Sequence, residues 1–266
     1  MQIVEHLTRH GGQSMRGLSR TLEFPLGSTH RLLTDLELEG VVERTTDDKW
    51  EVSYRLLHLA GLQYERIQLP KLVRPHLERL AAETRETAFL AAPSQDGIVY
   101  LDKVQSDQQL QLDVELGTRR PLHCTGLGKA ILALQSQVQR DRFLATARLE
   151  ALTPHTITDP LLLSVELERI REQGYATDRE EILPGVHCIA VPLLNYAGTV
   201  VGGISIAGAT PRIGTARFDG LVRRIKAAGD AVSTRLGYAR TPTEDAAESV
   251  VLGGGRGSLG DVNAGT

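Results

Sequence analysis

The stretch Pro121-Leu-His-Cys-Thr-Gly-Leu-Gly-Lys-Ala130 marks the point where the pattern of the chain changes from strand to helix. It predicts an extended segment that stops at Thr125 and continues as a helix through Leu132. Thr125 is a good N-cap, and Gly126 and Gly128 leave the backbone amides of the first turn uncovered. Unpaired amides at a helix start suit a small anion such as a carboxylate. An ordinary strand-to-helix turn with two glycines fits the same residues. The choice between an anion site and an ordinary turn therefore depends on the rest of the sequence.

Apolar and polar residues alternate on both sides of this stretch, which predicts an antiparallel sheet. Strands are expected at residues 88–92, 97–104, 110–116, 175–178, 186–195 and 199–208. Helices are expected at residues 70–84, 127–134, 138–147, 160–173 and 215–236. Asp159 and Pro160 start one of these helices and Gly174 ends it. The fold class is therefore α+β, with the sheet covered by helices.

Residues 1–53 predict a winged helix-turn-helix. Helices are expected at residues 1–10, 15–22 and 27–39, the last with Thr29, Leu32, Leu33 and Leu36 facing inward and Gly40 as its stop. A hairpin at 41–44 and 49–52 forms the wing. We expect the start of the third helix, a residue of the second and the wing to contact DNA. The candidate DNA contacts are Arg16, Ser28, Thr29, His30, Arg31, Arg44 and Lys49.

The chain has 266 residues, enough for two domains, and a formal net charge of −3. Residues 1–60 hold seven Lys and Arg against nine Asp and Glu, so DNA affinity must come from a local cluster that a dimer doubles. We expect a helical linker at 54–69, a sensor domain at 70–238 and a disordered tail at 239–266. The sequence lacks a signal peptide and a membrane span, which favours a cytoplasmic protein. The first helix begins abruptly, which leaves open whether it starts upstream of Met1.

Several stretches, in this order, resemble the IclR family of bacterial transcriptional regulators. Two of these stretches, residues 18–25 and 28–37, lie in the predicted winged helix-turn-helix. The predicted sensor domain contains Pro121–Ala130, then Gly174-Tyr-Ala-Thr-Asp-Arg-Glu-Glu, Pro184-Gly-Val-His-Cys-Ile-Ala-Val-Pro and Gly203-Ile-Ser-Ile-Ala-Gly. The resemblance covers about residues 1–237 and implies a winged helix-turn-helix joined to a GAF-like effector domain. It also implies homodimers or homotetramers, operator DNA, and a small carboxylate or oxo-acid effector, often of a catabolic operon.

By this resemblance the effector pocket uses the amides of Gly126 and Leu127, the carboxyl of Asp178, the thiol of Cys188 and the hydroxyl of Ser205. These groups can hold a carboxylate and a neighbouring oxo or hydroxyl group. We therefore expect a transcriptional repressor and not an activator, and a regulatory protein and not an enzyme. We expect no catalytic residue, no metal and no cofactor.

The chain departs from the family pattern at several positions. Glu23 stands where the family usually has the turn glycine. Leu26 and Gly27 replace the usual Lys-Ser, which puts phosphate anchoring there in doubt. Ala207 replaces a frequent pocket serine, so we expect a less polar end of the ligand.

Two His-Cys pairs keep other functions open. His123-Cys124 and His187-Cys188 could belong to a metal-binding sensor, or Cys188 to a GAF-type redox enzyme. In a strand, however, each pair would split across the sheet, so only one of His187 and Cys188 would face the pocket. Both thiols also fit small buried apolar groups, and Asp178 could instead cap a turn. His123 and Lys129 are expected to be structural or exposed.

Overall fold

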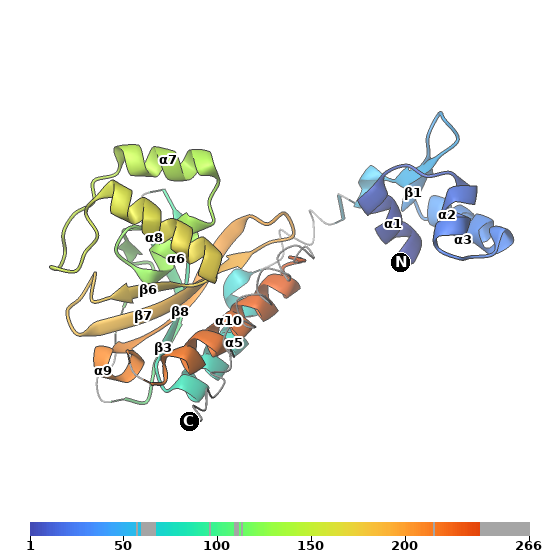
Figure 1. Cartoon of the computed structure of the whole chain (residues 1–266). Coiled ribbons are helices and arrows are strands. Elements are labelled where there is room, and N and C mark those ends of the chain that lie inside the picture. The colour runs from blue at the N-terminus through green and yellow to red at the C-terminus, as the bar shows by residue number, and fades with distance from the viewer. Residues whose placement is uncertain are drawn as a thin grey trace, which may run out of the picture. The chain divides into compact units, whose positions relative to one another are not determined.

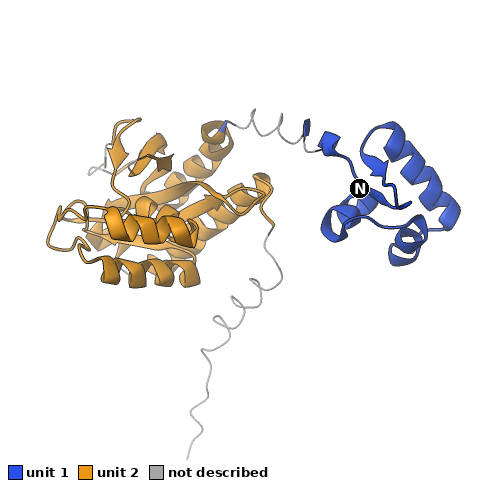
Figure 2. Cartoon of the chain, turned by 90° about the horizontal axis from the view of Figure 1, so that it is seen from above, with its two compact units in different colours: residues 1–68 blue, residues 69–266 orange. Residues whose placement is uncertain are grey.

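The structure is a computed structural model that describes residues 1–56, 58–59, 68–95, 97–108, 112, 114–214 and 216–239. The chain divides into two compact units, Met1–Gln68 and Leu69–Thr266 (Figure 2). The boundary falls in the predicted linker 54–69, most of which lies outside the described residues. The predicted tail 239–266 also lies outside them, apart from Ala239.

The first unit has the predicted helices and wing (Figure 1). Its elements are α1 (Gln2–His10), α2 (Met15–Thr21), α3 (Leu26–Leu38), β1 (Val42–Arg44) and β2 (Trp50–Val52). The β1–β2 pair is antiparallel, and an isolated bridge between Gln13 and Trp50 joins the wing to the segment before α2. The predicted ends of these elements agree with the structure to within about one residue.

The core of the first unit shows which face of α3 points inward. Thr29 and Leu33 are fully buried, whereas Leu32 is 43% exposed. The prediction that Leu32 faces inward is wrong, because the residue next to Leu33 is turned by about 100° around the helix. Leu33 packs in a cluster with Leu18 and Trp50.

Two residues with positive φ shape the chain around α3. Glu23 lies in the turn between α2 and α3 at φ 57°, a left-handed conformation that L residues other than glycine rarely adopt. Gly40 follows α3 at φ 67°, and its N–H donates to the Glu37 carbonyl. Gly40 therefore ends the helix as predicted.

The second unit is built on a six-stranded sheet with strand order β5-β4-β3-β8-β7-β6, in which all neighbours are antiparallel. Its strands are β3 (Thr87–Ser94), β4 (Gly97–Val104), β5 (Arg119–Arg120), β6 (Ala176–Arg179), β7 (Val186–Leu194) and β8 (Val200–Ala209). Its helices are α5 (Leu69–Thr84), α6 (Gly126–Ala133), α7 (Gln137–Thr146), α8 (Pro160–Gln173), α9 (Thr210–Ile213) and α10 (Phe218–Arg235).

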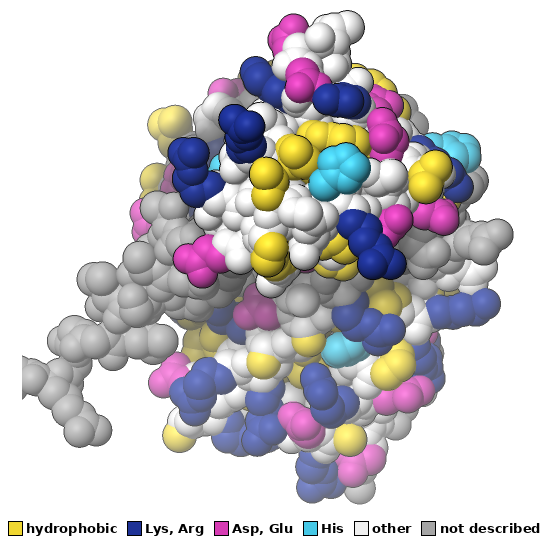
Figure 3. Space-filling view, turned by 90° about the vertical axis from the view of Figure 1, so that its right-hand side faces the viewer, with side chains coloured by type: hydrophobic (Ala, Val, Ile, Leu, Met, Phe, Trp, Pro, Cys, Tyr) yellow, Lys and Arg dark blue, Asp and Glu magenta, His cyan; other side chains and the backbone are white. Residues whose placement is uncertain are grey.

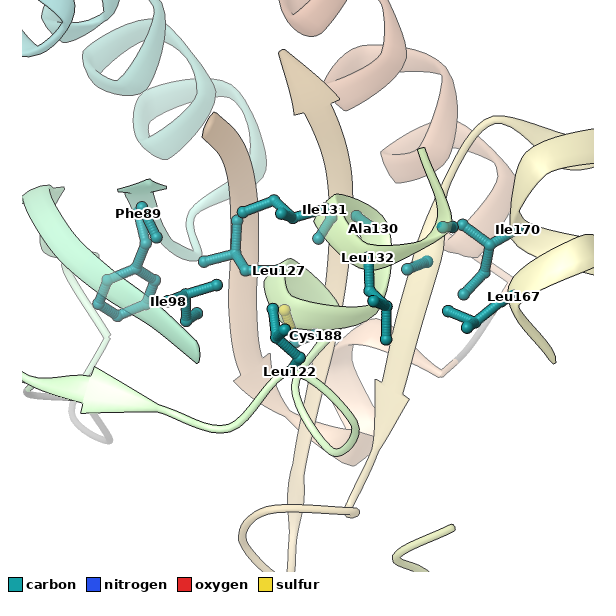
Figure 4. Packing of buried hydrophobic residues seen from close by; sticks show 14 of the residues in the cluster. Phe89, Ile98, Leu122, Leu127, Ala130, Ile131, Leu132, Leu167, Ile170 and Cys188 are labelled. Carbon is teal, nitrogen blue, oxygen red and sulfur yellow. The ribbon is translucent and has the colours of Figure 1, made fainter. Parts of the chain in front are cut away.

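The sheet lies between two helical layers. α5 and α10 cover one face, while α6 packs on the other face with α8 and α7 outside it (Figure 1). All eight residues of α6 are buried. Leu127, Ile131 and Leu132 of α6 join Leu167 and Ile170 of α8 in one apolar cluster with the sheet (Figure 4). The helix start that the sequence singled out is therefore held inside the domain.

Some predicted elements need correction. The expected strand at 110–116 is wrong in its described part, where residues 112 and 114–116 are not paired in a strand. The short strand β5 follows instead, and it pairs with β4. The last helix, expected from residue 215, begins at Phe218, and the unpredicted α9 precedes it. Residues 121–125 form bends and no strand, so His123 and Cys124 do not split across the sheet; both are buried.

Candidate functional site

The N-terminus of α6 is capped as predicted. The Thr125 hydroxyl oxygen accepts from the Gly128 N–H at 2.9 Å and donates to the Pro121 carbonyl at 3.1 Å. The Thr125 carbonyl accepts from the next amide, that of Lys129, at 2.9 Å. The N–H groups at the start of an α-helix have no partners within the helix. Of the amides of Gly126, Leu127 and Gly128, the Thr125 side chain binds only that of Gly128. The amides of Gly126 and Leu127 remain for an anion.

These two amides lie directly on the sheet. A Cβ added to Gly126 would come within 2.9 Å of the Cys188 sulfur and 3.6 Å of the Asp178 backbone nitrogen. Leu127 packs over β8, where a Cβ added to Gly203 would lie 3.1 Å from the Leu127 Cδ2 atom. Figure 4 shows Cys188 under the first turn of α6, beside Leu122. The absence of a side chain at Gly126 is what permits this close approach.

The predicted pocket residues share one face of the sheet. Asp178 pairs with Cys188, and Cys188 with Ala207, across three adjacent strands. Ser205 lies two residues from Ala207 on β8, on the same face. His187 points to the opposite face, where its ring lies 6.0 Å from that of Phe218 in α10. The prediction that His187 and Cys188 face opposite ways is confirmed, so these two groups cannot converge on one ligand.

Ser205 is a buried polar group without a partner. It is 1% exposed, and its hydroxyl oxygen finds no nitrogen or oxygen partner among the described residues. The polar atom next to it is the Cys188 thiol, a weak hydrogen-bonding group. A buried hydroxyl without a good partner costs free energy, so it suggests a group that is supplied from outside the chain.

Neither thiol is suited to nucleophilic chemistry. Burial raises the pKa of Cys188 far above its ordinary value, and the nearby Asp178 adds to that rise. Burial also raises the pKa of Cys124, to about 12. The thiolate is the nucleophile, so a thiol with a raised pKa is inert near neutral pH. This disfavours the redox-enzyme alternative for Cys188.

Asp178 has one of the two roles that the sequence offered as alternatives, that of capping a turn. Its Oδ1 atom accepts from the Glu181 N–H at 2.7 Å, so the prediction of a turn cap is confirmed for this oxygen. The residue is 2% exposed, and burial raises the pKa of its carboxyl to about 7, although the bond from Glu181 opposes that rise. Near neutral pH the group can therefore carry a proton, and a protonated carboxyl donates as well as accepts.

Sequence reasoning missed Tyr100 at this site. Its ring meets that of Phe89 edge to face at a centroid distance of 5.4 Å, against the same apolar cluster. Burial raises the pKa of the Tyr100 hydroxyl, and Cys188 and Asp178 add to that rise. The alternation in β4 carried the signal, since Tyr100 shares the face of the fully buried Ile98.

Lys129 and His123 are both buried and structural. Lys129 is 1% exposed, and its ammonium group contacts the carboxylate of Glu181 and lies 3.8 Å from that of Glu166. The His123 Nε2 atom lies 3.0 Å from the Glu150 carbonyl oxygen. The structural expectation is thus met for both residues, and exposure is excluded.

Other features of the surface do not coincide with this site. A hollow of about 390 Å³ lies between α5 and α10, on the other face of the sheet, and none of the predicted effector residues lines it. The described His, Cys, Asp and Glu side chains form no group of three or more that could hold a metal ion. In the described part of the chain, none of the helices has the length and apolar character that crossing a lipid bilayer requires.

The predicted DNA contacts are exposed with one exception. Arg16, Ser28, His30, Arg31, Arg44 and Lys49 are exposed. Thr29 is buried and its hydroxyl donates to the Pro25 carbonyl at 3.1 Å, which contradicts a DNA contact by this side chain. Arg44 forms an ion pair with Asp48, and its guanidinium carbon lies 5.9 Å from the centre of the Trp50 ring.

The start of α3 is open to a phosphate. Its N-cap residue, Pro25, offers no side-chain hydrogen bond, and nothing lies within 4 Å of a Cβ added to Gly27. Figure 3 shows a surface where Lys and Arg side chains are interspersed with acidic and apolar ones. Electrostatic attraction to DNA would therefore depend on individual side chains and on the helix start.

Comparisons with known proteins agree on one family. A family model described as bacterial transcriptional regulator IclR C-terminal matches residues 63–234. The chain is 32% identical over 252 residues to the HTH-type transcriptional regulator BhcR of Paracoccus denitrificans (strain Pd 1222), covering 93% of this chain and 88% of that protein. It is 30% identical over 237 residues to the HTH-type transcriptional repressor AllR of Salmonella typhi, covering 88% and 87%.

A solved structure supports the same assignment. The crystal structure of the Thermotoga maritima IclR superposes with a TM-score of 0.63 at 28% sequence identity, and the match covers 89% of this chain and 96% of that chain.

Proposed function

The chain belongs to the IclR family of bacterial transcriptional regulators, and from this premise we propose that it is a repressor controlled by a small organic acid. In this proposal the first unit binds operator DNA and the second unit binds the acid. The family consists of regulators and not of enzymes. The relative AllR is named a repressor, which supports this sign of regulation.

One observation carries the effector half of the proposal. The cap of α6 leaves the amides of Gly126 and Leu127 without an acceptor among the described residues, and on the sheet face that α6 covers the buried Ser205 hydroxyl has no nitrogen or oxygen partner among them either. Amides at a helix start bind anions through their N–H groups and the partial positive charge of the helix. The unpartnered hydroxyl supplies a second, neutral hydrogen-bonding position on the same face.

This arrangement favours a small carboxylate with an oxo or hydroxyl group beside it. The two amides would hold the carboxylate, while Ser205 donates to the neighbouring oxygen and Asp178 accepts from it, or donates when protonated. Ala207 and Tyr100 border this position with apolar surface. The carboxylate end is therefore fixed by charge and the other end is selected by shape and hydrogen bonds.

The DNA half of the proposal rests on α3. The exposed side chains of Ser28, His30 and Arg31 lie near its start, where recognition helices contact base edges. Arg16 and Lys49 would contact the phosphate backbone, and Arg44 would have to leave Asp48 to join them. A homodimer or homotetramer would double these few contacts and match two operator half-sites.

Effector and operator binding are then coupled. An acid that prefers one conformation of the chain lowers or raises operator affinity only by that preference, and DNA changes the affinity for the acid by the same factor. A regulator that responds to an organic acid fits a catabolic operon whose enzymes consume that acid. In the cell such a protein would act in the cytoplasm, on chromosomal DNA.

A thermal-shift screen of the full chain tests the proposal. The panel contains small mono- and dicarboxylates, oxo acids and aromatic acids, and each acid that raises the midpoint is then tested for its effect on binding to the DNA upstream of the neighbouring genes. We expect at least one acid to raise the midpoint and to change DNA affinity. A panel without a single shift, together with no retardation of that DNA, would contradict the proposal.

A further inference from the structure

A buried ion pair lies directly beside the candidate effector site. Lys129 is the fourth residue of α6, and its ammonium group lies within the domain at 1% exposure. It contacts the Oε1 atom of Glu181, a residue that is 6% exposed in the segment after β6. An ion pair taken out of water is costly to form and costlier to break from one side, so its presence needs a reason.

The pair leads to the Asp178 carboxyl. The Glu181 N–H donates to the Asp178 Oδ1 atom at 2.7 Å, and the backbone amide of Ile182 also interacts with that carboxyl, so its orientation depends on where the segment that begins at Glu181 lies. Glu181 depends on Lys129 in turn. The Glu181 Oε2 atom is buried without a partner among the described residues, and the other contact of Oε1 is the Arg179 amide at 3.5 Å. Without Lys129, both carboxylate oxygens would lack a strong partner.

The backbone of the same segment is held from its outer side. The Thr156 hydroxyl donates to the Glu181 carbonyl at 2.6 Å, and the Thr153 hydroxyl donates to the Glu180 carbonyl at 2.7 Å. These bonds fix the segment to the loop before α8. The Lys129–Glu181 contact joins the side chain of the same segment to α6.

We propose that Lys129 is a positioning residue of the effector site, which acts through Glu181 to fix Asp178 relative to the anion-binding amides of α6. The inference rests on the proposed function, because the two groups it joins are the two ends of the proposed site. The amides of Gly126 and Leu127 belong to the same rigid turn of helix as Lys129. The packing of α6 on β6 and β7 brings the two ends together, and the ion pair adds a side-chain connection that orients the Asp178 carboxyl at the selecting end.

The consequence concerns selectivity. An acid without a polar group at carbon 2 contacts only the amides, so its binding is insensitive to the position of Asp178. An acid with a hydroxyl or oxo group at carbon 2 also needs Asp178 in place. Removing Lys129 should therefore abolish the preference for substituted acids while unsubstituted acids bind as before.

The test uses the full chain with Lys129→Met, Lys129→Arg as the conservative rescue and Arg140→Met as the matched control. Arg140 is another buried cation, 4% exposed, which contacts Glu168 at 3.3 Å and the Gln135 carbonyl after α6 instead of Glu181. Two quantities are measured: hydrogen exchange of the residue 181 amide, and thermal shifts with propionate, lactate and pyruvate, which differ only at carbon 2.

We expect the residue 181 amide to exchange about tenfold faster in Lys129→Met, and slower again in Lys129→Arg, because the bond to Asp178 is lost and partly regained. Where lactate or pyruvate raises the thermal midpoint of the wild-type chain more than propionate does, that difference should disappear in Lys129→Met and persist in Arg140→Met. Unchanged exchange at residue 181 would overturn the inference.

Two further experimental outcomes also have a defined interpretation. If Lys129→Met does not fold, the double variant Lys129→Met/Glu181→Met removes both charges together, and the same two measurements apply to it. If none of the acids shifts the wild-type midpoint, the failure belongs to the proposed function. The exchange rate at residue 181 then still decides whether Lys129 positions Asp178.

Discussion

The sulfur of Cys188 occupies the space next to Gly126, only 2.9 Å from where a Cβ on that glycine would lie. The Ala190 Cβ atom is 3.4 Å from the same point. Residue 126 therefore has no room for a methyl group unless the Cys188 side chain, α6 or β7 moves. The amide of this residue is one of the two proposed to hold the effector carboxylate. A side chain at position 126 should therefore disturb both the packing of α6 on the sheet and the binding of the effector.

Gly126→Ala should abolish the effector-induced thermal shift and lower the free energy of unfolding by about 1–3 kcal/mol through overpacking. Gly27→Ala is the matched control, because it lies in the first turn of α3 with nothing within 4 Å of the added Cβ. Adding Cys188→Ala to Gly126→Ala should restore much of the lost stability. A wild-type shift in Gly126→Ala would remove this amide from the site.

Ser205→Ala should affect the free and bound protein in different ways. Without effector, the loss of a buried hydroxyl that has no nitrogen or oxygen partner should leave the thermal midpoint unchanged or raise it. With a hydroxy or oxo acid, the shift should shrink, because the second hydrogen-bonding position is gone. A large drop in the midpoint of the free protein would mean that the hydroxyl has a structural partner.

Asp178→Asn should stabilise the fold above neutral pH. The folded-state pKa of about 7 lies above the ordinary 3.8, so between these values the folded chain binds more protons than the unfolded chain. The stability contribution of this group is therefore complete below 3.8 and falls as the pH rises to about 7. Asparagine keeps an acceptor for the Glu181 N–H and removes the charge. Thermal midpoints at about pH 5 and about pH 8 should differ from wild type mainly at the higher pH; parallel curves would contradict this.

Arg31→Ala should weaken operator binding by about 5- to 150-fold, the equivalent of about 1–3 kcal/mol for a base or phosphate contact. The effector-induced thermal shift should not change, because Arg31 belongs to the other unit. Arg9→Ala on α1 is the control, since it removes an exposed arginine from the same unit outside the predicted contacts. Titrations at a fixed salt concentration measure both variants, and equal affinity of Arg31→Ala and wild type would exclude α3 as the reading helix.

Glu23→Gly should raise the free energy of unfolding of the first unit by about 0.5–1 kcal/mol. The gain comes from relief of the left-handed conformation at φ 57°, reduced by the greater entropy of glycine in the unfolded chain. Glu37→Gly in α3 should act in the opposite direction, by about 1 kcal/mol, because that residue is helical. Denaturant unfolding compares the two, and a loss of stability in Glu23→Gly would show that this side chain has a role in the turn.

Local signals were sufficient for much of the fold. Thr125 caps α6, Asp159 caps α8 and Gly174 ends it in a left-handed conformation, each as its residue type predicts. These signals act over a few residues, so a single sequence contains them in full. Strand alternation likewise placed Cys188 and His187 on opposite faces.

Contacts between distant residues could not be predicted in this way. Lys129 and Glu181 are far apart in the chain, and neither the spacing nor the composition marks them as partners. Tyr100 was missed because its strand also fits an ordinary amphipathic strand. Residues 110–116 alternate as a strand should, yet their described part is not paired in a strand, and β5 pairs with β4 only after it. Tertiary packing overrides the local pattern here.

The position of Trp50 offers an optical probe of one unit alone. It is the single tryptophan of the chain, and it is buried in the wing of the first unit, 7% exposed, near the Arg44 guanidinium. Emission excited at the red edge of the indole band therefore reports only on the first unit. If that emission changes when an acid binds the other unit, the rate of the change measures how fast the first unit responds to the acid. The measurement needs no label attached to the protein.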